Sequence, residues 1–335
     1  MSDHSTKDPA PIDWSGVMPA ITTPFAEDGS IDHAAVAARV ERAIAGGVTG
    51  IVPAGSLGEG ATLSTEEKGA LFATCVATAA DRVPVVAAIA SAATFDAISL
   101  AQLATDSGCR GLMVLPPYVH GGDLREVVAH FESIFTATRT PCMLYNNPIA
   151  YGADLRAPEI AVLAERFPHL GAVKESSGDS RRITALKHAL GDRLALFVGL
   201  DDLLVEGVRA GASGWVAGLV NAFPHESVRL FDFARAGDPA VDALYRWFLP
   251  LLRLDVVPDF VQRIKQVEAA LGLGSARVRA PRLPLREEDQ LEIAALVAHA
   301  IETAPLDQLR TGERGAGEAT KTDSTERTSD ETEER

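Results

Sequence analysis

The sequence predicts an α/β fold, a (β/α)8 TIM barrel with a C-terminal helical extension. Eight short apolar runs recur about 20–35 residues apart, each followed by an amphipathic helical stretch. The runs show no polar alternation, which is typical of parallel strands buried on both faces. No G-x-G-x-x-G pattern follows the first run, where Ala20–Phe25 stands instead. This disfavours the alternative architecture, an open doubly wound sheet.

The elements can be placed in chain order. The predicted strands are Val17–Ile21, Gly50–Ala54, Pro84–Ala90, Gly111–Leu115, Pro141–Tyr145, Gly171–Lys174, Leu194–Val198 and Gly214–Ala217. Ser64 is expected to cap the second helix, because early acidic residues follow it, and Gly46-Gly47 and Gly211 lie where helices are expected to end. Three further helices are predicted over Pro239–Leu254, Pro258–Leu273 and Arg286–Thr303.

Length and composition set the domain organisation. Of the 335 residues 47% are hydrophobic, and a barrel takes about 250 residues. We expect an N-terminal arm (1–13), the barrel (14–237), C-terminal helices (238–305) and an acidic tail (306–335). From Asp307 onward a single Leu is the only large apolar residue, so this tail is predicted to be disordered.

The charge and the cysteine content indicate which partners and which cellular compartment to expect. The net charge of -15 disfavours nucleic acid and anionic membranes as partners. The first 14 residues lack the apolar core of a signal peptide, and no apolar run approaches the roughly 20 residues of a membrane span. Cys75, Cys109 and Cys142 are odd in number and far apart. A cytoplasmic protein with reduced, buried cysteines is therefore expected.

Lys174 is the first candidate catalytic residue, because it stands at the end of a buried strand, where barrel enzymes place their chemistry. Burial would lower the pKa of its amine and free the lone pair to attack a carbonyl carbon. The alternative, an ion pair with Glu175, is disfavoured because adjacent strand residues point to opposite faces.

Two neighbouring strand ends supply complementary groups. Tyr145 can transfer protons during imine formation, although a core aromatic with one satisfied hydroxyl is the alternative. The loop Gly55-Ser56-Leu57-Gly58-Glu59 permits a tight turn whose amides can hold a carboxylate. Ser56 adds a hydroxyl that could relay protons. Gly199, Asp201 and Val216, on the last two strands and the loop between them, are further candidate substrate-binding residues.

Phosphate and metal sites are not predicted. The seventh strand ends in Asp201-Asp202, which would repel the dianion that barrels often bind at this position. The eight histidines are scattered along the chain, without the spacing of metal ligands.

These residues resemble the dihydrodipicolinate synthase / N-acetylneuraminate lyase family of class I Schiff-base lyases. The likeness runs from about Trp14 to Leu285 and rests on four motifs in order: Thr22-Thr23-Pro24-Phe25 with Asp28–Asp32, Gly55–Glu59, Tyr145-Asn146-Asn147-Pro148 and Lys174-Glu175-Ser176-Ser177.

The resemblance implies an enzyme without a cofactor that acts on a small keto acid or imino acid and forms homo-oligomers, tetramers or dimers. It implies Lys174 as the Schiff-base lysine, Tyr145 as proton shuttle and Ser56 as relay hydroxyl. The amides of Ser56 and Leu57 would bind the 2-keto carboxylate, and Tyr118 resembles the tyrosine that crosses a subunit interface to complete the relay.

Two departures bear on the substrate. Leu57 replaces a second hydroxyl residue, and Ala150 stands where the synthases of lysine biosynthesis carry an arginine for a second carboxylate. The stretches Gly214–Asn221 and Ala280–Leu285 resemble the catabolic branch, so a 1-pyrroline-4-hydroxy-2-carboxylate deaminase or a 2-keto-3-deoxy acid dehydratase or aldolase is the leading hypothesis. The alternatives are a 4-hydroxy-tetrahydrodipicolinate synthase and a non-catalytic barrel that binds a keto acid.

Overall fold

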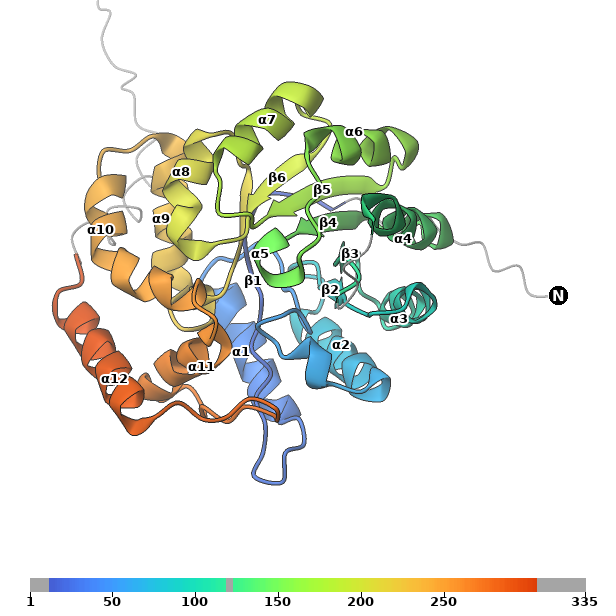
Figure 1. Ribbon diagram of the computed structural model, residues 1–335. Helices are drawn as coiled ribbons and strands as arrows, with labels where there is room; N and C mark the ends of the chain where they lie inside the picture. Colours follow the sequence, from blue (N-terminus) through green and yellow to red (C-terminus); the bar gives the residue numbers. More distant parts are fainter. Residues whose placement is uncertain (1–11, 119–122, 306–335) are drawn as a thin grey trace, which may run out of the picture. The chain divides into compact units, whose positions relative to one another are not determined.

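Parallel strands form the centre of the fold, with helices around them (Figure 1). The computed structural model describes residues 12–118 and 123–305. The strands are β1 Gly16–Pro19, β2 Val86–Ile89, β3 Gly111–Val114, β4 Cys142–Asn146, β5 Leu170–Glu175, β6 Ala195–Val198 and β7 Gly214–Ala217. They pair in the order β1-β7-β6-β5-β4-β3-β2, every pair parallel. All seven lie within or overlap the predicted apolar runs.

The second predicted strand, Gly50–Ala54, is reduced to two isolated bridges that nevertheless close the barrel. Ile51 bridges Val85, the residue just before β2, and Val52 bridges Ala20, the residue just after β1. Backbone hydrogen bonds run to both neighbours, among them Val52 N to Pro19 O (2.9 Å) and Val86 N to Ile51 O (2.8 Å). The predicted (β/α)8 barrel is therefore confirmed, with one strand shorter than the sequence suggests.

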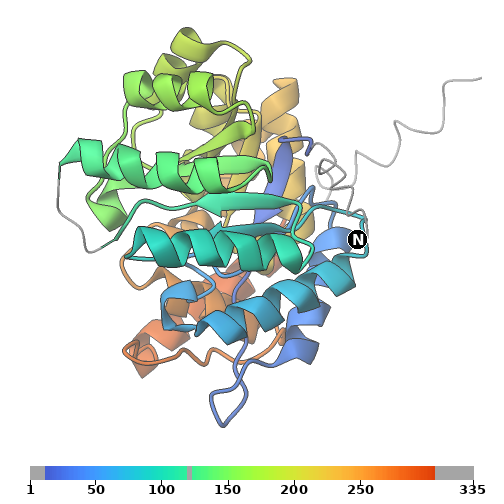
Figure 2. The ribbon, with the colours of Figure 1, turned by 90° about the vertical axis from the view of Figure 1, so that its right-hand side faces the viewer.

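Helices cover the outside of the barrel. The helices between and after the strands are α1 His33–Ala45, α2 Thr65–Ala79, α3 Thr94–Asp106, α4 Leu124–Ala137, α5 Pro148–Tyr151, α6 Ala157–Arg166, α7 Arg181–Leu190, α8 Leu204–Arg209 and α9 Pro224–Ala236. Figure 2 shows α2, α3 and α4 in succession along the outside of the strands. Ser64 caps α2 as predicted, in a capping box with Glu67, and α1 ends at Gly46.

Three more helices follow, over the stretches that the sequence predicted: α10 Val241–Leu252, α11 Phe260–Ala270 and α12 Glu287–Glu302. The 3-10 helices are η1 Gly60–Thr62, η2 Asp201–Leu203, η3 Leu219–Asn221 and η4 Arg253–Asp255. Helix α12 packs against α10 and α11, and α10 packs against α9. The C-terminal helices thus adjoin the last unit of the barrel.

The amino-terminal end of the barrel is closed by Trp14, which contacts two strands. A Cβ at Gly171 would lie 2.5 Å from the Trp14 indole nitrogen, and one at Gly111 would lie 3.1 Å from the indole ring. The ring also meets Phe197 edge-on at 6.4 Å.

The remaining sequence predictions concern the cysteines, the two ends of the chain and membrane-spanning segments. Cys75, Cys109 and Cys142 are free and buried, as expected. Most of the N-terminal arm and the predicted tail, 306–335, lie outside the described residues. None of the helices in the described ranges is long and apolar enough to cross a membrane.

Candidate active site

A cavity of about 510 Å³ opens at the carboxyl ends of the strands, which is the size of a small-molecule site. The predicted residues that line it are Ser56, Leu57, Tyr145, Lys174, Gly199 and Val216. Side chains from outside the strand ends complete the wall: Asn147, Ile149, Ala150, Tyr151, Asp255, Val256, Val257, Pro258, Phe260 and Arg282. The barrel therefore brings most of the predicted site together.

Lys174 enters the cavity from β5 beside Tyr145 of β4, its partner in register. Its side chain is almost wholly buried, with the residue 6% exposed, and the ammonium nitrogen lies 4.3 Å from the centroid of the Tyr145 ring. Burial lowers the pKa of the amine to about 8, against the attraction of the Asp255 and Asp201 carboxyl groups. A substantial share of the amine is therefore unprotonated near neutral pH.

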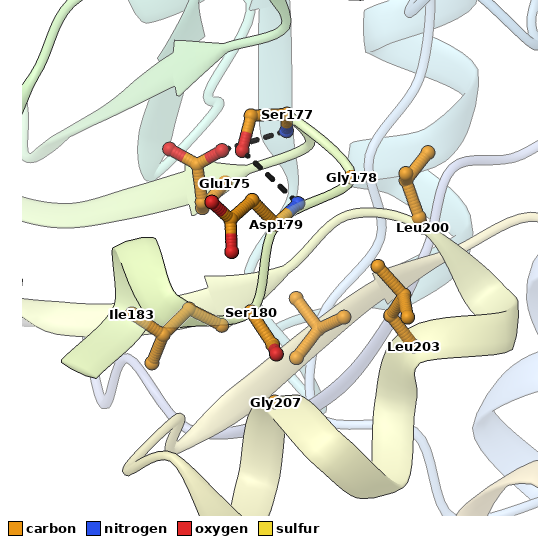
Figure 3. A pocket seen from close by; sticks show the side chains of 10 residues that line it. Glu175, Ser177, Gly178, Asp179, Ser180, Ile183, Leu200, Leu203 and Gly207 are labelled. Atoms are coloured by element: carbon orange, nitrogen blue, oxygen red, sulfur yellow. Dashed lines mark hydrogen bonds between the residues drawn. The ribbon is translucent and has the colours of Figure 1, made fainter.

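Glu175 points away from Lys174, as the strand alternation predicts. Its carboxylate accepts hydrogen bonds from the Asn146 side chain (2.9 Å) and the Ser177 amide (2.6 Å). Figure 3 shows this side chain beside a second, much smaller cavity of about 10 Å³, lined by the turn after β5 and by Gly207. That volume has room for about one water molecule, so it is not a substrate site.

The Tyr145 hydroxyl is buried in the cavity lining and has one hydrogen-bond donor beside it. Its hydroxyl accepts a hydrogen bond from the Asn147 side chain at 2.9 Å. Burial raises the pKa of the phenol, and the hydrogen bond from Asn147 only partly opposes the shift. The hydroxyl therefore keeps its proton at neutral pH and can deliver it to a neighbouring oxygen or nitrogen.

The loop 55–59 offers two backbone donors to the cavity. Within the described residues neither the Ser56 amide nor the Leu57 amide donates a hydrogen bond. Glycine is required at Gly58, where a Cβ would lie 2.7 Å from the Ile21 carbonyl oxygen. Thr23 donates to the Gly58 carbonyl at 2.7 Å and holds the turn. Two unpaired backbone amides at one turn are the kind of donors that bind carboxylates in proteins.

Glu59 anchors the same loop from within the fold. Its side chain is fully buried and forms an ion pair with Lys265 of α11, also fully buried. The Arg279 amide donates to the same carboxylate at 2.9 Å. The segment after α11 therefore lies against the loop and carries Arg282 to the edge of the cavity.

Two predicted site residues do not line the cavity. Asp201 is wholly buried behind its wall, where the carboxylate accepts hydrogen bonds from the Trp215 indole and from the Gly218 and Leu219 amides. Direct contact of Asp201 with substrate is therefore not favoured by this placement. Tyr118 lies outside the lining but close enough to Tyr151 to raise the pKa of that phenol further, after burial and Tyr145. Its expected place across a subunit interface stays a prediction.

The lining residues that the sequence reasoning missed include Tyr151, Asp255 and Arg282. Tyr151, in the turn after β4, hydrogen-bonds with the Ser56 hydroxyl, and its ring meets that of Tyr145 edge-on at 6.0 Å. Asp255 and Arg282 come from segments beyond the barrel. The sequence carries one indication of Asp255 as a site residue: it is a polar residue within the otherwise apolar stretch Leu254–Val257.

The site can hold an anion at two places, the free loop amides and the guanidinium of Arg282. Arg282 lies 3.6 Å from the Glu59 carboxylate, so part of its charge is already compensated. Within residues 12–118 and 123–305, no three or more His, Cys, Asp or Glu side chains converge to hold a metal ion.

Comparison with known proteins gives one consistent result. A family model described as the dihydrodipicolinate synthetase family matches residues 13–300. A 4-hydroxy-tetrahydrodipicolinate synthase of Sorangium cellulosum is 35% identical over 84% of this chain and 94% of its own, and one of Bartonella bacilliformis is 32% identical over 85% and 97%.

Solved structures agree with these sequence matches. The 4-hydroxy-tetrahydrodipicolinate synthase of Methylacidiphilum fumariolicum superposes with a TM-score of 0.84 at 28% identity, covering 88% of this chain and 99% of that one. A prophage protein of the same family from E. coli K12, in complex with pyruvate, gives a TM-score of 0.81 at 26% identity, covering 86% and 98%.

Proposed function

Because the chain belongs to the dihydrodipicolinate synthetase family of Schiff-base lyases, we propose that Lys174 forms an imine with the C2 carbon of a small 2-oxo acid or cyclic imino acid. One observation carries the proposal. The buried Lys174 amine lies over the Tyr145 ring in a cavity where the Ser56 and Leu57 amides have no partner among the described residues. The pyruvate bound to the E. coli prophage protein supports a 2-oxo acid as the class of ligand.

The chemistry follows from these positions. The Ser56 and Leu57 amides hold the substrate carboxylate, and the unprotonated Lys174 amine adds to C2. The Tyr145 hydroxyl protonates the oxygen of the resulting carbinolamine, which leaves as water when the C–O bond breaks. With a cyclic imine, the same addition is followed by cleavage of the bond from C2 to the ring nitrogen. Ser56 and Tyr151, which share a hydrogen bond, pass the replacement proton to Tyr145.

The lining favours a compact substrate with one carboxylate. Leu57, Ile149, Val256 and Val257 contribute apolar surface to the cavity, which suits neither a long polyol chain nor a second charged group. Ala150 lines the cavity and offers no guanidinium. The proposed substrate is therefore a 4-hydroxylated acid, and the activity that of a 1-pyrroline-4-hydroxy-2-carboxylate deaminase or a 2-keto-3-deoxy acid dehydratase. The enamine formed from the imine would expel the 4-hydroxyl.

Arg282 favours a second candidate, a 4-hydroxy-tetrahydrodipicolinate synthase. Its guanidinium lies at the edge of the cavity and could hold the second carboxylate of aspartate semialdehyde. The Sorangium and Bartonella relatives carry this name. The proximity of the Glu59 carboxylate weakens Arg282 as an anion site, which is why this activity ranks second.

A comparison of kcat/KM for both reactions in one preparation separates the candidates. The proposal expects turnover of a 4-hydroxylated acid or imine, with little or no condensation of pyruvate with aspartate semialdehyde. Efficient condensation without activity on hydroxylated substrates would contradict it. Arg282→Gln should then abolish the condensation, whereas Arg286→Gln, at an exposed arginine outside the cavity, is the matched control.

A further inference from the structure

Asp255, at the end of η4, lines the same cavity as Lys174 although it comes from the helices beyond the barrel. Its Oδ1 atom is buried and has no hydrogen-bond partner within the described chain. A Cβ at Gly218 would lie 1.9 Å from this oxygen, so the carboxyl group presses against the backbone at the end of β7. A buried polar atom without a partner is costly, and it is commonly found where a ligand completes the contact.

Asp201 lies next to Asp255, but its carboxylate, unlike the Asp255 Oδ1 atom, has several hydrogen-bond donors. Its carboxylate accepts hydrogen bonds from the Leu219 amide (2.8 Å), the Trp215 indole (3.0 Å) and the Gly218 amide (3.1 and 3.2 Å). Three N–H donors stabilise a carboxylate in its ionised form. Although burial raises the pKa of Asp201, these donors limit the rise to about 6.

Asp255 therefore carries the proton of the pair. Burial, followed by the negative charge of Asp201, raises the pKa of Asp255 well above its ordinary value. Two neighbouring carboxyl groups whose surroundings separate their pKa values divide into one anion and one acid. Because Lys174 also interacts with both carboxyl groups, the charge of each of the three groups affects the titration of the other two.

A simple counterion role for Asp255 is not favoured. Among the described residues the Lys174 amine donates no hydrogen bond to Asp255 or Asp201, and it lies over the Tyr145 ring instead. Tyr145 enters the cavity from β4 and Asp255 from η4. The cavity thus holds two proton donors from different parts of the fold, and imine formation uses only one of them.

We propose that Asp255 is the general acid that protonates the hydroxyl group leaving from C4 of the substrate. This inference rests on the proposed function and deepens it. In the step, the electron pair of the Lys174 enamine forms a double bond between C3 and C4, and the C4–O bond breaks. The Asp255 proton moves to the departing oxygen, which leaves as water. The products are a conjugated iminium on Lys174 and an Asp255 carboxylate.

The test compares Asp255→Asn with the parent enzyme in three assays: borohydride trapping of the imine with pyruvate, exchange of the C3 protons of pyruvate with deuterium, and turnover of the 4-hydroxylated substrate. The first two report the imine and the enamine without any leaving group. Because Asn matches the neutral, protonated form of Asp255 in shape and charge, we expect trapping and exchange to change less than about threefold. Turnover should fall by about 10²–10⁴-fold, the range for a general acid. Asp202→Asn removes a half-buried carboxylate outside the cavity lining and is the matched control; its three rates should stay within about threefold.

A leaving group that needs less protonation provides the second readout. With fluoride in place of the 4-hydroxyl, the loss caused by Asp255→Asn should shrink to less than about tenfold, because fluoride departs without full proton transfer. An Asp255→Asn enzyme that turns over the hydroxylated substrate at the parent rate overturns the assignment, as does an equal loss in trapping and exchange. A parent enzyme that exchanges C3 protons but never releases the hydroxyl contradicts the proposed function itself.

Discussion

The dependence of imine formation on pH tests how the fold activates Lys174. Burial lowers the pKa of this amine to about 8, whereas an exposed lysine titrates near 10.4. At pH 7 an amine of pKa 8 is about one-tenth unprotonated, and one of pKa 10.4 about one part in 2,500, so burial enriches the reactive form by a factor of about 230. Because the unprotonated amine is the nucleophile, the rate should rise about tenfold per pH unit below pH 8 and level off above it.

The rate can be followed by mixing the enzyme with pyruvate and quenching aliquots with borohydride at successive times. Tyr145 does not interfere, because burial raises the pKa of its phenol above the ordinary value near 10. The pH at which the rate levels off reflects the combined titration of Lys174, Asp201 and Asp255, because their charges interact. A rate that still climbs about tenfold per unit between pH 8.5 and 9.5 would show that the cavity does not lower this pKa.

Three substitutions test other parts of the site. Tyr145→Phe keeps the ring below the amine but removes the proton donor, so kcat should fall by about 10²–10⁴-fold at an unchanged melting temperature; parental turnover would mean that the tyrosine only packs. Tyr151→Phe removes the hydrogen bond to Ser56 and should lower kcat by about tenfold with little effect on KM; an unchanged kcat would exclude it from the relay. Gly199→Ala would place a Cβ 2.0 Å from the Ser176 hydroxyl oxygen and 2.7 Å from Cε of Lys174, so borohydride trapping should slow by at least about tenfold; trapping at the parent rate would show that both side chains can move aside freely.

The barrel could be predicted from the sequence because its strands are continuous apolar runs separated by helical patterns. The exception is Gly50–Ala54, where only Ile51 and Val52 form bridges. Pro53 has no N–H to donate, and Ala54 adopts a left-handed conformation with φ 58°, so the strand ends early. Apolar content alone carries no information on this backbone turn.

The site was predictable only where it lies on strand ends. Lys174 and Tyr145 follow buried strands, and topology brings the ends of neighbouring strands together. Asp255 and Arg282 reach the cavity through the packing of the C-terminal segments on the barrel, which no local periodicity encodes. Asp201 follows a strand as well, yet Trp215 and two amides bind its carboxylate behind the wall, and the sequence pattern cannot distinguish such a residue from one that faces substrate.

The central claim is that Lys174 bonds covalently to the substrate, and peptide mapping after borohydride reduction tests it most directly. The enzyme is incubated with pyruvate or a 4-hydroxylated acid, reduced, digested and analysed by mass spectrometry. Lys68→Ala is the matched control, because Lys68 is a second lysine whose pKa is lowered by burial but which lies outside the cavity. We predict a reduced adduct on the Lys174 peptide of the parent and of Lys68→Ala, and none in Lys174→Ala. An adduct on a different lysine, or turnover by Lys174→Ala at the parent rate, would contradict the account.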